Sequence, residues 1–173
     1  MDRSTPTIIS VPVTTNVALY SLIRLRFSKL MAAITPIQFH FLQAVTLQER
    51  QALKAFIRSI FKKEKKAFTS LNYIFCSDEY LLDINRQHLN HDYYTDIITF
   101  ELNGKQEPVI GEIYISVERV RENARTFKTS LKEELHRVIF HGALHLCGYK
   151  DKNSKQEKEM RAKEAQYLRS YFR

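Results

Sequence analysis

The chain is 173 residues long and 44% hydrophobic, which suits one domain with a sizeable core and argues against wholesale disorder. Its apolar runs are all too short to cross a bilayer. The two cysteines, Cys76 and Cys147, are far apart in sequence and suggest no disulfide framework, so we expect a reducing, cytoplasmic setting. The net charge of +8 favours a polyanionic partner such as RNA, although ordinary solubility charge accounts for it about equally well.

Residues 1–30 differ in composition from the rest of the chain. They are rich in Ser and Thr, contain a single acidic residue and follow no helical or strand period. Transit peptides share this composition, so a targeting segment is one interpretation. A dispensable extension ahead of Met31 is the interpretation we favour. We therefore predict an N-terminal extension over 1–30, disordered or dispensable, and a single domain over 31–173.

From Pro36 onward, segments with strand and helix patterns are interspersed. Runs rich in β-branched and aromatic residues predict strands at 37–42, 71–76, 96–102 and 109–116. Apolar residues at helical spacing predict helices at 46–66, 77–89, 116–127, 131–147 and from 154 toward the C-terminus. One sheet covered by helices is the economical arrangement, so the predicted fold class is α+β with one mixed sheet.

Several helix boundaries have their own local signals. Capping boxes, in which Ser or Thr is followed three residues later by Glu, begin at Thr46, Ser130 and Ser154. Ser116 is a further candidate N-cap. Gly148 predicts the end of the helix that Ser130 opens, because glycine readily adopts the left-handed conformation that follows many helices.

The stretch from His141 to Asp151 has the most specific pattern in the chain. Two histidines four residues apart share one face of a helix, with Cβ atoms about 5–6 Å apart, so both imidazoles can reach one ion. Gly148 permits a turn, and Asp151 then occupies the position of the third ligand in H-x-x-x-H-x-x-G-x-x-H metalloenzymes. Two nitrogens and one carboxylate oxygen leave the fourth position of zinc open, as catalysis requires. We predict a metal site of His141, His145 and Asp151 at the C-terminal end of a central helix.

Two observations narrow the chemistry of this site. Each histidine alone is more often a satisfied structural side chain, but the pair, the glycine and the acid together make that the minority interpretation. Zinc peptidases have a glutamate directly after the first histidine as general base, and here that position is Gly142. Metal-bound water has a pKa of about 7, and it needs less help from a base when the electrophile is a phosphodiester. The pattern therefore disfavours a peptidase.

The same stretch resembles the HGxLHLxGYDH signature of the YbeY family of rRNA maturation endoribonucleases. Asn85 and the residues from Asp92 to Phe100 are similar to the family's N…D-x-x-T-D-V-L-S-F block, and Gly111 to Ile115 to its G-D-I-x-I strand. The likeness runs from about Ile37 to Phe172 in matching order. It implies an α+β fold, one zinc ion per chain and cleavage of single-stranded RNA. It also implies a role in rRNA maturation, at the 3′ end of 16S rRNA, and in ribosome quality control.

Three positions depart from the family's pattern. Asp151 stands where a third histidine is usual, which keeps a ligand but makes the site more anionic, and Lys150 replaces the preceding aspartate. Leu89 occupies the place of an arginine that family members use near the scissile phosphate. Arg86 lies three residues earlier, on the same face of the predicted helix, and is the candidate catalytic cation in its place. An ordinary exposed arginine is an equally good interpretation of Arg86.

Two further features have weaker links to RNA. Basic residues recur every four positions from Arg50 to Lys62 and continue to Lys66; this stripe could follow a phosphate backbone but is more often the solvated face of an amphipathic helix. Tyr93 and Tyr94 precede a strand in a polar stretch, where exposed rings could stack on single-stranded bases. Packing at the rim of the core is the more ordinary role for such rings. Both tyrosines remain candidate RNA-binding residues.

These observations lead to one hypothesis and two rivals. The hypothesis is a zinc-dependent endoribonuclease in which zinc on His141, His145 and Asp151 activates a water that attacks phosphorus. Arg86 or the ion would stabilise the developing charge. The partners would be rRNA or ribosomal particles, with no small-molecule cofactor and no membrane. The rivals are a non-catalytic, metal-stabilised ribosome-associated factor and a small zinc peptidase.

Overall fold

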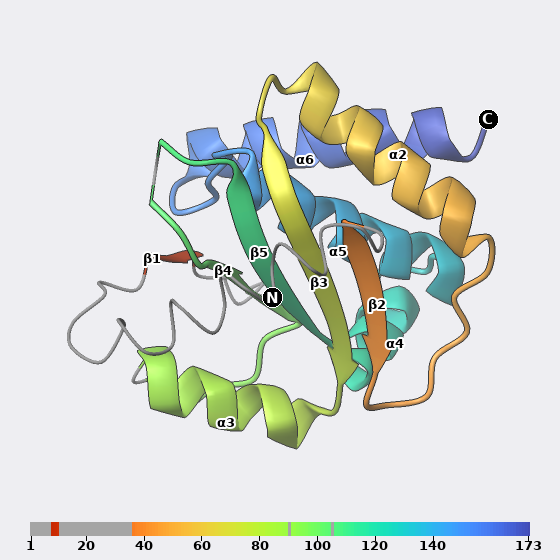
Figure 1. Ribbon diagram of the computed structural model, residues 1–173. Helices are drawn as coiled ribbons and strands as arrows, with labels where there is room; N and C mark the ends of the chain where they lie inside the picture. The colour runs from red at the N-terminus through yellow and green to blue at the C-terminus, as the bar shows by residue number, and fades with distance from the viewer. Residues whose placement is uncertain (1–7, 11–35, 90, 105) are drawn as a thin grey trace.

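A computed structural model describes residues 8–10, 36–89, 91–104 and 106–173 (Figure 1). Their five-stranded sheet has the order β1-β4-β5-β3-β2. The strands are β1 (Ile8–Ser10), β2 (Ile37–Phe41), β3 (Phe68–Cys76), β4 (Ile97–Glu101) and β5 (Val109–Ser116). β2, β3 and β5 run parallel to one another, β4 is antiparallel to β5, and β1 is parallel to β4. The sheet is mixed, which confirms the predicted α+β class.

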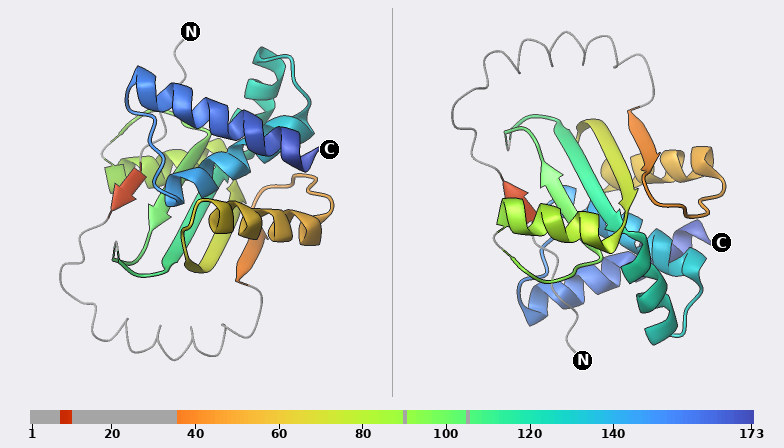
Figure 2. Two further views of the ribbon diagram at one scale, coloured as in Figure 1. Left: turned by 90° about the horizontal axis from the view of Figure 1, so that it is seen from above. Right: turned by 90° about the horizontal axis from the view of Figure 1, so that it is seen from below.

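Helices cover both faces of this sheet, but unequally (Figures 1 and 2). The described helices are α2 (Arg50–Lys63), α3 (Asp78–Leu89), α4 (Val117–Thr126), α5 (Leu131–Leu146) and α6 (Ser154–Tyr171). The main core contains apolar residues of α2, α4, α5 and α6 against one face of the sheet. α3 packs on the other face, where Leu81 meets Ile98 and Phe100 in a second, smaller cluster. The alternation of Ile97 and Ile98 between the two clusters is the two-residue period of a strand.

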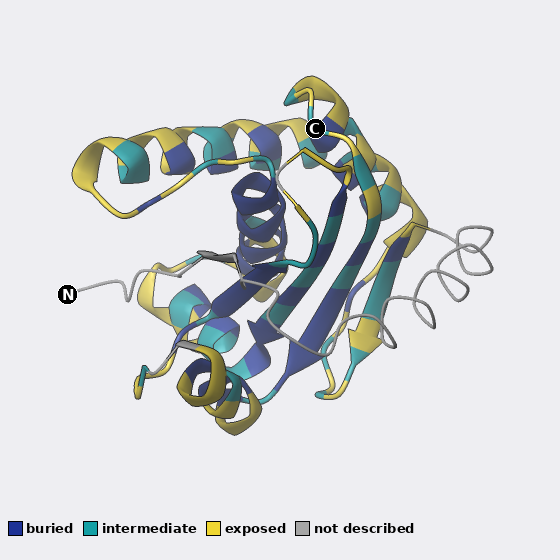
Figure 3. Cartoon of the chain, turned by 60° about the vertical axis from the view of Figure 1, so that its left-hand side comes forward, coloured by how far each residue is buried: buried dark blue, intermediate teal, exposed yellow. Residues whose placement is uncertain are grey.

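α5 is the central helix, and every residue from Val138 to Leu146 is buried (Figure 3). Gly142 lets this helix lie directly against the sheet. A Cβ atom at that position would lie 2.8 Å from Ile113 and 2.9 Å from Ile97, closer than real side chains approach. The helix that carries both histidines is therefore fixed against β4 and β5 by close packing on its own backbone.

The start of α2 differs from the prediction. The capping box at Thr46 does not form, because α2 begins at Arg50 after Glu49, which is left-handed at φ 49° and makes no side-chain cap. Leu47 in the preceding loop is buried. Burial of that side chain, rather than a local cap, thus sets the path of the chain into the helix.

The other predicted helix starts agree with the structure or miss by one residue. The cap of α6 is Asn153 rather than Ser154, and its side chain accepts a hydrogen bond from the Gln156 amide. Asn is at least as good a cap as Ser, so the cap is the earlier of the two neighbours and the helix itself begins at Ser154. The predicted caps Ser116 and Ser130 are confirmed, since each hydroxyl accepts a backbone N–H of the first turn.

The predicted extension over 1–30 lies outside the described residues, except for Ile8–Ser10. These three residues form β1 at the edge of the sheet, where they pair with Thr99, Phe100 and Glu101 of β4. Among the helices of the described part, none is long and apolar enough to span a bilayer.

Candidate metal centre

α5 ends in a turn that leads the chain back past its own last residues. Gly148 has a φ of 103°, the left-handed conformation predicted for it. Its amide donates to the His145 carbonyl at 2.9 Å, and the Tyr149 amide donates to the Leu144 carbonyl at 3.1 Å. These two bonds are the Schellman motif, which satisfies the last carbonyls of a helix. The turn brings Asp151, three residues further on, beside the two histidines.

The three predicted ligands converge on one point. The Oδ2 atom of Asp151 lies 3.6 Å from Nε2 of His141 and 3.5 Å from Nε2 of His145. All three side chains are buried, and their ligand atoms lie within 4.8 Å of one another. Ligand atoms about 2.0–2.1 Å from a tetrahedral zinc ion lie about 3.3–3.4 Å apart. The spacing of the three atoms therefore fits one ion.

The other ring nitrogen of each histidine already has a partner. Nδ1 of His141 lies 2.5 Å from Oε1 of Glu164, and Nδ1 of His145 lies 2.9 Å from the Tyr149 carbonyl. Both Nε2 atoms are buried and have no hydrogen-bond partner among the described residues. Burial lowers the pKa of His145 against the opposing effect of Asp151, so its ring is neutral at neutral pH. Two buried, unsatisfied nitrogens facing one carboxylate are rare except at a metal site.

Glu164, on α6, anchors His141 and is itself anchored. Arg137 lies 3.4 Å from Glu164, 2.7 Å from Glu134 and 3.2 Å from Asp96. Burial alone would raise the pKa of Glu164, but the His141 hydrogen bond and the charge of Arg137 outweigh burial and lower it. Glu164 is therefore a carboxylate that accepts the Nδ1 proton of His141. The sequence did not predict this role, because α6 contains many charged residues and nothing in their spacing distinguishes Glu164 from the exposed ones.

A second anchor holds the turn that carries Asp151. The hydroxyl of Tyr149 donates to Glu64 at 2.8 Å, and Lys163 lies 2.8 Å from the same carboxylate. The buried Tyr167 hydroxyl also donates to Glu64. Glu64 directly follows the last residue of α2, and Lys163 and Tyr167 belong to α6. The turn at the end of α5 is therefore fixed by contacts with both α2 and α6.

Two neighbours of the predicted ligands, Gly142 and Cys147, lie outside the cluster of ligand side chains. Gly142 faces the sheet, so a glutamate in its place would collide with Ile113 and Ile97 rather than reach a substrate. Cys147 packs against the main core, and burial raises its pKa to about 12. Cys147 is not among the clustered side chains that could hold a metal ion.

The structure places Arg86 apart from this cluster. Arg86 belongs to α3, on the face of the sheet opposite α5, and its side chain is about half exposed. Its Nε atom lies 2.7 Å from Asp92, and a second guanidinium nitrogen lies 3.7 Å from Asp83. Leu89 is the last residue of α3, and its side chain lies outside the described part of the structure.

The two candidate tyrosines are exposed rather than packed at the rim of the core, at 40% for Tyr93 and 43% for Tyr94. The Tyr93 ring stacks on His91 with centroids 5.1 Å apart, and its carbonyl accepts a hydrogen bond from Asn85. The guanidinium of Arg119 lies 5.1 Å from the centroid of Tyr94. Both rings are thus held in place by a neighbour while remaining open to solvent.

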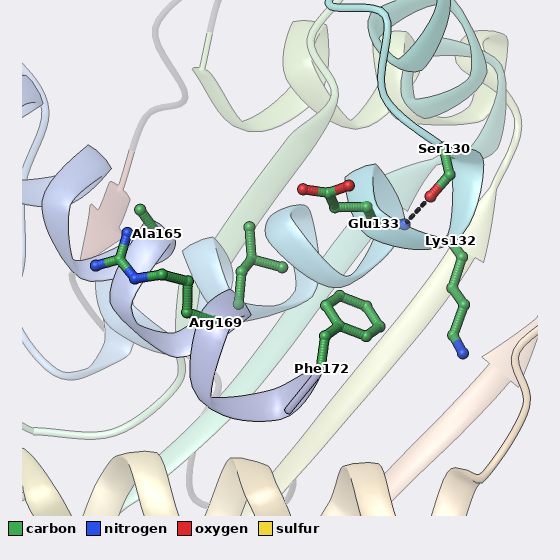
Figure 4. Close-up of a pocket in the computed structure, with 7 residues that line it drawn as sticks. Ser130, Lys132, Glu133, Ala165, Arg169 and Phe172 are labelled. Atoms are coloured by element: carbon green, nitrogen blue, oxygen red, sulfur yellow. Dashed lines mark hydrogen bonds between the residues drawn. The ribbon is translucent and has the colours of Figure 1, made fainter.

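A pocket of about 500 Å³ lies at the other end of α5 (Figure 4). It lies between the first turn of α5 and the end of α6, and its wall includes Lys132, Arg169 and Phe172. Lys132 and His141 are nine residues apart along the helix, which corresponds to about 14 Å. The pocket is therefore distinct from the candidate metal centre.

Fold and site together define a small α+β protein with a metal-binding group at the end of a buried helix. A model of the family described as Endoribonuclease YbeY matches residues 39–172. The chain therefore belongs to the YbeY family, as its motifs suggested.

Individual relatives agree with this assignment. The Endoribonuclease YbeY of Cytophaga hutchinsonii is 52% identical over 118 residues, covering 68% of this chain and 82% of the relative. That of Flavobacterium psychrophilum is 46% identical over 135 residues, covering 78% and 96%. The solution structure of a Thermotoga maritima protein matches with a TM-score of 0.55 and 31% identity, covering 78% of this chain and 89% of that one.

Proposed function

We propose that this chain is a zinc-dependent endoribonuclease that hydrolyses phosphodiester bonds of single-stranded RNA, with His141, His145 and Asp151 as metal ligands. The carrying observation is the pair of buried Nε2 atoms that lack partners and face one carboxylate oxygen. Two nitrogens and one carboxylate oxygen suit zinc with an open fourth position. The relatives named Endoribonuclease YbeY support the choice of reaction.

Residues around the metal site set the orientation of its two histidines and its net charge. A zinc ion held there would supply Lewis acidity, lowering the pKa of water and neutralising charge on a phosphate oxygen. Glu164 keeps the proton of His141 on Nδ1, and the Tyr149 carbonyl does the same for His145. Both Nε2 lone pairs therefore point to the same place. Asp151 adds a single negative charge, so a divalent ion on this ligand set remains positive and electrophilic.

We assign the predicted supporting roles to Arg86 and the two tyrosines. Arg86 would stabilise charge on the phosphate from the side of α3, on the sheet face opposite α5, which requires the RNA to reach both sides and Arg86 to exchange Asp92 for it. An exposed ion pair contributes about 0–1 kcal/mol, so this exchange costs little. Tyr93 and Tyr94 would stack on unpaired bases, since their rings are exposed and already restrained. The substrate would be rRNA, alone or in ribosomal particles in the cytoplasm.

The test combines metal content with RNA cleavage. The purified protein should contain close to one equivalent of zinc and cleave unstructured RNA, and a chelator should stop the cleavage. His141→Ala should lose both metal and activity. His40→Ala is the matched control, because His40 is an exposed histidine on β2. Full metal retention by His141→Ala would refute the site, whereas bound zinc without cleavage would favour the non-catalytic ribosome-associated factor.

A further inference from the structure

α2 is the most one-sidedly charged helix of the described structure. Five of its fourteen residues are basic and none is acidic. Four of the five form a single row at four-residue spacing, which we call the α2 basic face: Arg50, Lys54, Arg58 and Lys62. The apolar residues of the same helix, Leu53, Ile57, Ile60 and Phe61, are buried in the core, and the basic row runs along the edge of this buried face.

The α2 basic face is not an ordinary solvated surface of mixed charge. α6, another amphipathic helix of this protein, has acidic residues among its basic ones, with Glu157 and Glu159 between Lys155 and Arg161. Like charges four residues apart on a helix repel one another, and α2 has three such pairs in succession. Among the ion pairs of the described residues, none includes a member of the α2 basic face. The positive charge of this row is left available to an external anion.

Two members of the row are held in position by rings. The guanidinium of Arg50 lies 4.4 Å from the centroid of Phe41, and Nζ of Lys54 lies 5.6 Å from that of Phe39. Cation–π contacts restrain these long side chains without neutralising them. Less conformational entropy is then lost when the charges bind a ligand.

The C-terminal end of α2 leads to the candidate metal centre. Glu64, directly after the helix, accepts a hydrogen bond from Tyr149. Tyr149 and Asp151 belong to the same turn, with the exposed Lys150 between them. The C-terminal end of α2, where the row of cations also ends, is therefore joined through Glu64 to the turn that carries the third ligand.

We infer that the α2 basic face binds the phosphate backbone of the RNA strand whose cleavage is proposed above, so this inference rests on the proposed function. Arg50 and Lys62 are twelve positions apart, which corresponds to about 18 Å along the helix. Stacked nucleic acid has about one phosphate per 3.4 Å of each strand, so the face covers roughly five phosphates. Contacts of this kind read charge and not base, which gives affinity along the strand without sequence preference.

The experiment measures RNA binding as a function of salt. The zinc-loaded full chain is titrated with a short, unstructured, 2′-O-methyl RNA at several salt concentrations. The test variant is Arg50→Gln/Lys54→Gln/Arg58→Gln/Lys62→Gln. The control variant removes four exposed cations of α6, so its net charge is the same: Lys155→Gln/Lys158→Gln/Arg161→Gln/Arg169→Gln. Zinc content and melting temperature verify that both variants are folded.

The α2 variant should bind on the order of 10²-fold more weakly at about 0.1 M salt, because each lost phosphate contact removes about 0.7 from the slope of log K against log salt. Its slope should fall by about 2–3, whereas the α6 variant should lose less than about 1. Equal losses of RNA affinity in the two variants would show that only the net charge of the protein matters, and would overturn the inference. An unchanged slope in the α2 variant, with the parent still cleaving RNA, would overturn the inference alone. A parent that neither binds nor cleaves RNA would overturn the proposed function with it.

Discussion

The hydrogen bond between Glu164 and His141 leads to the sharpest prediction about the metal centre. Glu164→Gln keeps the shape of the side chain but removes its charge. The Nδ1–Oε1 distance is 2.5 Å and both side chains are buried, so this is a strong, charge-assisted bond. The substituted amide would be placed between His141 and Arg137, which both present N–H donors. Its single oxygen can satisfy only one of them.

The two orientations of the amide weaken zinc binding by different routes. With its oxygen toward His141, the amide accepts the Nδ1 proton as before, but as a neutral and weaker acceptor, and its NH₂ group faces Arg137. With its oxygen toward Arg137, the NH₂ group donates to Nδ1 and favours the tautomer protonated on Nε2, which cannot bind a metal. Loss of an outer partner of this kind typically reduces metal affinity about 10–100-fold, or about 1.4–2.7 kcal/mol.

Competition with a chromophoric chelator measures this affinity directly, and ¹⁵N shifts of the His141 ring report its tautomer. Glu134→Gln is the matched control, because Glu134 binds the same Arg137 at 2.7 Å while its described hydrogen bonds do not include His141. Glu134→Gln should bind zinc nearly as tightly as the parent. Parental zinc affinity in Glu164→Gln, or an equal loss in Glu134→Gln, would show that tautomer control by Glu164 is not what stabilises the site.

Three other predictions concern other parts of the molecule. Arg86→Ala should leave zinc content and melting temperature nearly unchanged while slowing RNA cleavage by about 10²–10³, and Leu89→Arg should restore the rate; undiminished cleavage would remove Arg86 from the mechanism. A chain that begins at Met31 lacks β1, which pairs with β4 through only three residues at the sheet edge. It should therefore bind zinc and melt within a few degrees of the full chain. A large drop in melting temperature would show that residues 1–30 contribute to the stability of the fold. Burial lowers the pKa of His136, so the unfolded chain takes up this proton first as the pH falls. The stability that depends on His136 is thus full above about pH 6.5 and is lost progressively below it, and His136→Asn should flatten this part of the stability curve in chemical denaturation.

Local sequence signals predicted the parts of the structure that local forces determine. The spacing of His141, His145 and Gly148 predicted the helix face and its end, because side chains four apart and a left-handed glycine act within one or two turns. The capping box at Thr46 failed for the opposite reason. Burial of Leu47 is a tertiary effect, and it overrode the local preference of the residues beside it.

At Gly142 the sequence provided only part of the reason for the inference drawn from it. The absence of a glutamate at this position argued against a peptidase, and the structure agrees with that argument. The structure adds that the position faces Ile113 and Ile97, so no side chain there could reach a substrate. The same glycine that excludes the general base also permits the close contact that fixes the histidine helix on the sheet.

The residues that sequence reasoning missed are those whose partners are distant in the chain. Glu164 follows His141 by 23 residues, and Glu64 precedes Tyr149 by 85, so no spacing rule connects them. Asp96 illustrates what the structure adds to a motif. It lies in the block that resembles the family's T-D-V-L-S-F, yet it is not one of the three clustered ligand side chains. Asp96 binds Arg137, which binds Glu164, which holds the ring of His141. A motif at the start of β4 and a motif on α5 are therefore parts of one largely buried chain of charges that ends at the metal centre.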